Sequence, residues 1–229
     1  MLLLCLTACR AEARPGVSRV WPELGTMMSA AAWASVGTQS TRLARALDAA
    51  HDSVDRIEAL LQQRVRIGAI DSLRAEIRRR SGIALTVDSL AAGYALDRAA
   101  LALAPVVDSA LLDIGGQYLW IGARPTHRAV GIPDPDNTLR TLAVVEMRNG
   151  SVRTQTRRDP PPGGARSVTV LATEGLTANA WAAAFLALGC DRALTEPQGL
   201  GVVCADSAGV RWTTDLQNRV SLPPTARGP

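Results

Sequence analysis

The second half of the chain is divided into short apolar segments by glycine, proline and asparagine, a pattern that excludes a purely helical fold. Each segment has the length of a β-strand and is too short for an ordinary globular helix. The segments cover residues 110–116, 118–123, 128–132, 139–147, 152–156, 167–171, 201–205 and 210–215. Because the breaks between them are short, they predict a mostly antiparallel sheet.

Helical patterns precede and interrupt these strands. Apolar residues from Leu43 to Leu61 recur at spacings of 4, 3, 4, 3 and 4, behind a Ser40-Thr41 pair that can cap a helix. The other predicted helices cover residues 71–80, 88–105 and 177–189, and one further strand covers residues 25–36. Together these elements predict an α+β or mixed α/β fold in which helices pack on a mostly antiparallel sheet.

The length of 229 residues suits one domain of ordinary size. We expect this domain to span residues 23–216. Residues 10–22 contain proline, arginine and glycine and are predicted to be a linker, and residues 217–229 are predicted to be a flexible tail.

All 25 basic residues are arginine, because the chain contains no lysine. This excludes a Schiff-base mechanism, a P-loop and a lysine general base. The net charge is only +4, and the longest basic run is Arg78-Arg79-Arg80. We therefore expect no nucleic-acid partner.

The first ten residues form an apolar run that ends in Leu6-Thr7-Ala8-Cys9. This tetrapeptide resembles the bacterial lipobox, whose cysteine carries lipid in the mature protein. The run is too short to span a membrane. We expect residues 1–9 to be a lipoprotein signal and Cys9 to be a lipid anchor that holds the protein in the bacterial cell envelope, in the periplasm or elsewhere outside the cytoplasm. The alternative is an apolar start without a signal function.

Cys190 and Cys204 are the two remaining thiols once the signal is removed. In an oxidising compartment they could form a disulfide that links the end of a helix to the next strand. Two separate buried thiols are the alternative, because spacing in the sequence does not give the distance between Cα atoms.

Two glycine-containing segments could approach a ligand closely. Leu112-Asp113-Ile114-Gly115-Gly116 places two unhindered amides at the end of a strand, where phosphate or ribose could bind. Taken alone, the motif favours the simpler explanation, a tight turn between two strands. Asp88 or Ser89 could cap a helix whose N-terminus favours an anion, and Gly93 would admit a ligand or a neighbouring backbone.

Zinc and nucleophile motifs are missing from the sequence. His51 falls within a helical pattern and His127 between two strands, and neither belongs to a His-x-x-x-His motif. There is also no Cys-x-x-Cys and no Gly-x-Ser-x-Gly. A hard ion held by oxygen atoms, such as Mg²⁺, is compatible with the sequence.

The order of the motifs carries more information than any one of them. The motifs are Gly-Thr at 25–26, Ala-Gly-Tyr-Ala-Leu-Asp-Arg-Ala at 92–99, Leu-Asp-Ile-Gly-Gly at 112–116, Gly-Ile-Pro-Asp-Pro at 131–135, and Ser-Val-Thr-Val-Leu-Ala at 167–172 before a small-residue helix. This order resembles the ApbE family of FAD:protein FMN transferases from Leu24 to Asp215. The resemblance implies that FAD is cleaved with Mg²⁺, that AMP is released, and that FMN is joined through its phosphate to a threonine of an acceptor protein.

The resemblance also implies a set of site residues. FAD would contact Leu24, Thr86, Ser89, Gly93, Tyr94, Asp113, Gly115 and Gly116, and Mg²⁺ would be held near Ser89 and Asn179. Arg98, Arg153 and Arg157 are candidates for neutralising part of the diphosphate charge.

Several positions depart from the family pattern. Thr86 replaces an acid, Ala92 replaces a lysine, Asn179 replaces an aspartate and Ala183 replaces a threonine. Two alternatives therefore stand beside the transferase: a non-catalytic envelope lipoprotein that binds flavin or a partner on the same scaffold, and an envelope scaffold that binds no ligand.

Overall fold

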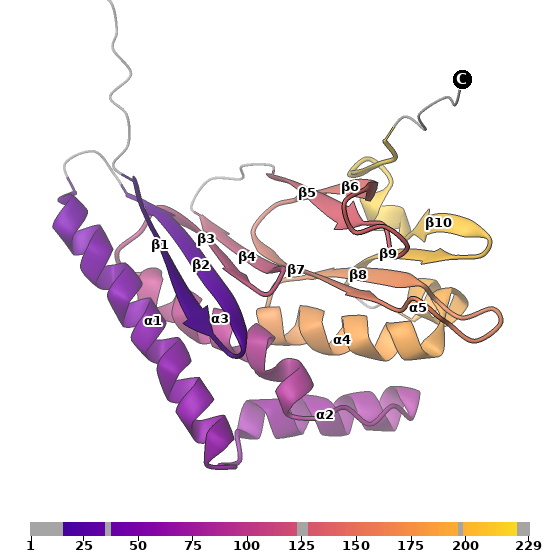
Figure 1. Cartoon of the computed structure of the whole chain (residues 1–229), viewed down its shortest axis with the longest axis horizontal. Coiled ribbons are helices and arrows are strands. Elements are labelled where there is room, and N and C mark those ends of the chain that lie inside the picture. Colours follow the sequence, from indigo (N-terminus) through magenta and orange to yellow (C-terminus); the bar gives the residue numbers. More distant parts are fainter. Residues whose placement is uncertain (1–15, 35–37, 123–127, 197–198, 224–229) are drawn as a thin grey trace, which may run out of the picture.

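The computed structural model describes residues 16–34, 38–122, 128–196 and 199–223 (Figure 1). The predicted lipoprotein signal at residues 1–9, including Cys9, lies outside the described residues, as does His127. Among the residues described, no helix has the length and apolar character needed to cross a membrane.

A large antiparallel sheet forms the centre of the molecule. Its strand order is β1-β2-β3-β4-β7-β8-β9-β10. The strands are β1 Gly16–Glu23, β2 Thr26–Trp33, β3 Ser109–Ile114, β4 Gln117–Gly122, β7 Gly150–Thr156, β8 Ser167–Ala172, β9 Gly201–Asp206 and β10 Gly209–Trp212. A smaller sheet has the order β11-β6-β5, with β5 Arg128–Pro133, β6 Thr141–Met147 and β11 Val220–Ser221. These sheets confirm the predicted fold class.

The helices cover one face of the large sheet, and the small sheet lies over the other face (Figure 1). The helices are α1 Ser40–Gln62, α2 Gly68–Ser81, α3 Ala91–Leu103, α4 Gly175–Leu188 and α5 Cys190–Thr195, with short 3-10 helices η1 Asp88–Leu90 and η2 Thr214–Leu216.

The large sheet is covered by one layer on each face, which explains why the residues of its central strands are buried on both faces. Val168 and Val170 of β8 pack in the cluster with the helices, whereas Leu171 packs in the cluster with the small sheet. Strands that are covered on both faces are buried along their length, as β8 and β9 are from the first to the fifth residue, and β8 also buries Ser167 and Thr169.

Helix α1 follows the predicted periodicity but not the predicted cap. Leu43, Leu47 and Val54 are buried as the spacing requires. The cap position is occupied by Gln39, which makes no capping hydrogen bond with its side chain, rather than by Ser40 or Thr41. The packing of the apolar face is therefore the main stabilising contribution to this helix.

The predicted linker at residues 10–22 is wrong from Gly16 onward, because those residues form β1. Every residue of β1 pairs with β2, and Val17 and Trp21 pack against the main core. Pro22 is compatible with this assignment because β1 is an edge strand, where a missing N–H leaves no neighbour without a partner.

The predicted tail is also wrong in part. Val220 and Ser221 pair with β6, and the Arg219 side chain donates to the Glu146 carbonyl, which attaches residues 219–221 to the small sheet. Residues 224–229 lie outside the described residues. The sequence patterns also missed α5, which has only six residues.

Cys190 and Cys204 form a disulfide with a Cα–Cα distance of 5.5 Å. It links the start of α5 to β9, which decides between the two alternatives left open by the sequence.

Helices α3 and α4 approach each other through a pair of glycines. A Cβ added to Gly93 would lie 2.7 Å from the carbonyl carbon of Gly175, and a Cβ added to Gly175 would lie 2.5 Å from the Gly93 carbonyl oxygen. Gly93 therefore admits a neighbouring backbone, which was one of the two possibilities that the sequence offered.

Asp97 stabilises the same contact one turn further along α3. Its carboxylate accepts hydrogen bonds from the backbone N–H groups of Gly175 (2.6 Å) and Leu176 (2.9 Å) at the start of α4. Burial nevertheless raises the pKa of Asp97 to about 6, because desolvation outweighs these two hydrogen bonds. Asp97 thus satisfies N–H groups that the first turn of α4 cannot satisfy itself.

We expect Gly93→Ala to lower the free energy of unfolding by about 1–3 kcal/mol, because the new methyl group must displace the α4 backbone. Urea denaturation measures the change. Gly68→Ala is the matched control, since a Cβ at Gly68 meets open space at the start of α2 and its effect should be close to zero. Equal stability of the two variants would contradict the close contact.

Candidate functional site

A cavity of about 520 Å³ opens where two hairpin turns meet the helices. The elements around it are the β1–β2 turn, the end of α1, the η1–α3 junction, the β3–β4 turn and β7. Its apolar wall is formed by Leu24, Leu61, Ala91, Ala92 and Ile114. Its polar wall is formed by Thr26, Glu58, Gln62, Asp88 and Arg153, with Gly115 between them.

The β1–β2 turn places Leu24 in this wall. Leu24 and Gly25 have φ angles of 49° and 72°, which is the left-handed conformation that two-residue hairpin turns require. Leucine rarely adopts positive φ. The Leu24 N–H donates to Glu58 Oε2 at 3.4 Å, and this contact joins the turn to α1.

The β3–β4 turn contains the predicted glycine pair. Gly115 and Gly116 have φ angles of 55° and 77°, and the Gly116 N–H donates to Asp113 Oδ1 at 2.9 Å. The pair therefore makes the tight turn that the sequence offered as one explanation. Gly115 also lines the cavity, so the turn brings backbone atoms to the place where a ligand can reach them.

Arg153 is the cation in this cavity wall, among the residues that the structure describes. Its Nη1 donates to the Gly115 carbonyl at 2.9 Å, while its buried Nε has no hydrogen-bond partner among the described residues. Burial lowers the pKa of Arg153, and the charge of Asp113 opposes that shift. A guanidinium in a partly buried cavity wall is suited to an anion.

The other two predicted arginines lie elsewhere. Arg98 lines a different cavity of about 360 Å³, together with Tyr94 and Asp97. Arg157 follows the end of β7, and its N–H donates to the Arg166 carbonyl at 2.8 Å.

The remaining predicted FAD contacts are divided between several places. Ser89 Oγ donates to the Thr86 carbonyl at 2.8 Å, and Thr86 Oγ1 accepts from the Ser89 N–H at 3.3 Å, so these two residues close the turn before η1 beside Asp88 of the wall. Gly93 faces Gly175, and Tyr94 lines the second cavity. The structure therefore brings Leu24 and Gly115 together and separates them from Gly93 and Tyr94.

Asn179 of α4 is buried, and its Oδ1 has no hydrogen-bond partner among the described residues. Helix α4 packs against η1, which carries Ser89. An unpartnered buried carbonyl is a suitable ligand for a hard cation. Asn179 and Ser89 are both uncharged, so a cation held there needs its negative ligands from a bound molecule.

The sequence patterns did not single out Glu58 or Gln62, whereas Thr26 belongs to the Gly-Thr motif at 25–26. Glu58 lies within the predicted 43–61 helix, three residues before Leu61, so both reach the same side of α1. The hydrophobic spacing shows that Glu58 and Leu61 share a side of α1. It does not show that this side faces a cavity, which requires the folded structure.

The comparisons with known proteins agree with the fold. The ApbE family model matches residues 25–159. The flavin transferase ApbE of Vibrio cholerae shares 16% identity with the chain, with a TM-score of 0.60 over 90% of this chain and 100% of that one. The flavinyl transferase ApbE of Pseudomonas stutzeri shares 15% identity, with a TM-score of 0.65 over 91% and 98%.

The ApbE protein of Thermotoga maritima is similar to the same degree, with 15% identity and a TM-score of 0.65 over 90% of this chain and 99% of that one. No curated protein sequence matches the chain. The family model covers more than half of the sequence and nearly all of the cavity wall, including Arg153. The chain therefore belongs to the ApbE family.

Proposed function

We propose that this protein is a flavin transferase that binds FAD in the cavity around Gly115 and Arg153. The observation that carries the proposal is the placement of Arg153, beside the Gly115 turn, in the wall of a cavity in an ApbE fold. The structural neighbours from Vibrio cholerae and Pseudomonas stutzeri are described as flavin and flavinyl transferases.

The proposed reaction transfers FMN from FAD to an acceptor protein. The hydroxyl oxygen of an acceptor threonine forms a bond to the FMN-side phosphorus, and the bond from that phosphorus to the bridging oxygen breaks. AMP leaves with the bridging oxygen, and the hydroxyl proton is lost. Such transfers depend mostly on positioning and on neutralising phosphate charge.

Arg153 supplies positive charge for the FAD diphosphate. A charge-assisted hydrogen bond contributes about 1.5–3 kcal/mol, and the partly buried position of Arg153 reduces screening by water. Leu24, Ala92 and Ile114 offer apolar surface beside it for the ring systems of FAD. Because Gly115 has no side chain, FAD can approach the backbone of the β3–β4 turn closely.

Mg²⁺ is part of the proposed reaction. Asn179 Oδ1 and Ser89 would hold it, with FAD phosphate oxygens as the negative ligands that these residues lack. When bound, the ion neutralises charge that develops on the diphosphate. The protein contributes the buried side-chain carbonyl of Asn179, which accepts no hydrogen bond from any described residue.

A non-catalytic flavin-binding protein is the second candidate. Ala92 lines the cavity at the position where the family pattern has lysine, so this departure falls in the site itself. Such a protein would bind FAD through the same wall but would release no AMP.

We expect Arg153→Gln to weaken FAD binding about 10- to 100-fold, which corresponds to loss of one charge-assisted hydrogen bond. Quenching of flavin fluorescence during titration, with and without Mg²⁺, measures the dissociation constant. Arg158→Gln is the matched control, because Arg158 is an exposed arginine five residues away with the same charge. Equal affinities of the wild type and Arg153→Gln would show that FAD does not bind in this cavity.

We also propose a location in the bacterial cell envelope, with a lipid anchor at Cys9, on the basis of the Leu6-Thr7-Ala8-Cys9 sequence. Cys9→Ser should move the protein from the membrane fraction to the soluble fraction of lysed cells. Recovery of the variant in the membrane fraction at the wild-type level would contradict the lipid anchor.

A further inference from the structure

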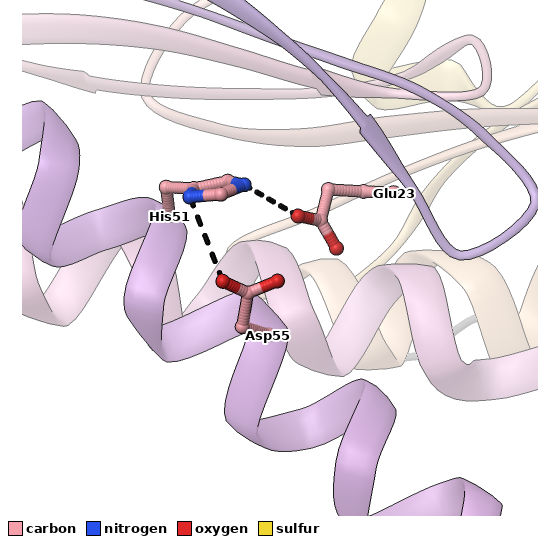
Figure 2. A group of neighbouring side chains, drawn as sticks. All are labelled: Glu23, His51 and Asp55. Atoms are coloured by element: carbon pink, nitrogen blue, oxygen red, sulfur yellow. Dashed lines mark ion pairs between the residues drawn. The ribbon is translucent and has the colours of Figure 1, made fainter.

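Three side chains that could bind a metal ion converge beside the cavity, outside the set that the sequence indicated. Glu23 comes from the end of β1, and His51 and Asp55 lie one turn apart on α1 (Figure 2). One ligand atom from each lies within 4.8 Å of the other two. His51 Nε2 is 2.5 Å from Glu23 Oε1, and His51 Nδ1 is 3.7 Å from Asp55 Oδ2.

Glu23 is the least accessible member of this cluster, with a side chain that is 2% exposed. Its second oxygen, Oε2, is buried and accepts no hydrogen bond from any described residue. Figure 2 shows one Glu23 oxygen directed at His51 and the other turned away from the ring, with Asp55 on the neighbouring turn of α1. A buried carboxylate close to a second carboxylate is unfavourable unless a proton or a cation is shared between them. Burial, and after it the neighbouring Asp55, raise the pKa of Glu23 to about 7, so the pair is ready to exchange a proton for a metal ion.

The arginines do not supply that cation. Although the chain has 25 basic residues, none of the arginines in the described part of the chain forms an ion pair with Glu23 or Asp55. Glu58, one turn beyond Asp55, adds another carboxylate to this side of α1. The cluster therefore places several carboxyl groups next to one imidazole, with no arginine among them in the described part of the chain.

The imidazole ring of His51 is held in position by Trp21. The two rings stack with centroids 4.7 Å apart and an interplanar angle of 13°. Stacking between β1 and α1 leaves the ring nitrogens directed along the plane toward the carboxylates (Figure 2). A ligand that is oriented before the ion arrives loses little entropy on binding.

We propose that Glu23, His51 and Asp55 form a binding site for a divalent cation of the Zn²⁺ or Mn²⁺ class. One imidazole nitrogen and two carboxylates are a donor set for such ions, whereas Mg²⁺ prefers oxygen ligands alone. Three protein ligands leave positions for water. This site is separate from the proposed Mg²⁺ site at Ser89 and Asn179. Its three ligands come from the protein alone, so the metal should bind with or without FAD.

The ion would join the β1–β2 hairpin to α1. Glu23 directly precedes Leu24, and the Leu24 N–H already contacts Glu58 of the same helix. A bound ion at Glu23 therefore stabilises the turn that forms one wall of the cavity. The expected consequence is higher thermal stability with the metal than without it.

The test is equilibrium dialysis of the purified, chelator-treated protein against Zn²⁺, Mn²⁺ and Mg²⁺, with metal content as the readout. We expect the wild type to bind one equivalent of Zn²⁺ or Mn²⁺, with Mg²⁺ weaker. Glu23→Gln and Asp55→Asn should each weaken binding about tenfold or more. Asp52→Asn is the matched control, because Asp52 is an exposed carboxylate on the same helix.

Melting temperature gives a second readout. Zn²⁺ or Mn²⁺ should raise it in the wild type and in Asp52→Asn, but not in Glu23→Gln or Asp55→Asn. The Asp55 side chain is 56% exposed, so Asp55→Asn should leave the fold intact. This variant therefore tests metal binding even if Glu23→Gln, at a buried position, lowers the stability of the protein. No stoichiometric binding by the wild type, or equal binding by the wild type and Asp55→Asn, would overturn the proposal. Tighter binding of Mg²⁺ than of Zn²⁺ and Mn²⁺ would overturn the assigned class of ion.

Discussion

The backbone of Gly175 is the point at which three elements behind the site are joined. Gly93 of α3 packs directly on it, Asp97 of α3 accepts its N–H, and the Gln117 side chain of β4 donates to its carbonyl at 2.7 Å. A side chain on either glycine would separate α3 from α4. The position of α3 relative to the β3–β4 turn, and therefore the shape of the cavity between them, depends on this contact.

The strands and helices with strong periodicity could be predicted from the sequence, whereas elements that depend on distant partners could not. Helix α1 was recognisable because its apolar face repeats over six positions. Strand β1 contains Pro22 and exposed polar residues, and it is ordered by pairing with β2 rather than by its own composition. Short α5 is held by the disulfide at Cys190, which spacing could not establish.

The site was predictable only in part, for geometric reasons. The turn at Gly115 and Gly116 could be predicted because a glycine pair favours a tight turn through its local backbone conformation, and this turn brings Gly115 to the cavity. Ala92 and Tyr94 are two residues apart on α3, which corresponds to a rotation of about 200° around the helix. Ala92 consequently faces the cavity and Tyr94 faces a different one. Glu23 and His51 are far apart in the sequence, so their contact exists only in the folded chain.

The proposed function requires the cavity around Arg153 to support transfer of FMN to a threonine. The most direct measurement is incubation of the protein with FAD, Mg²⁺ and an acceptor protein that carries a threonine, followed by denaturing electrophoresis and quantification of AMP. We expect a covalently fluorescent acceptor band and an equal amount of AMP, both absent when the acceptor threonine is replaced by alanine. FAD binding without a fluorescent band or AMP, across divalent metals and acceptors, would contradict it and leave the flavin-binding protein in its place.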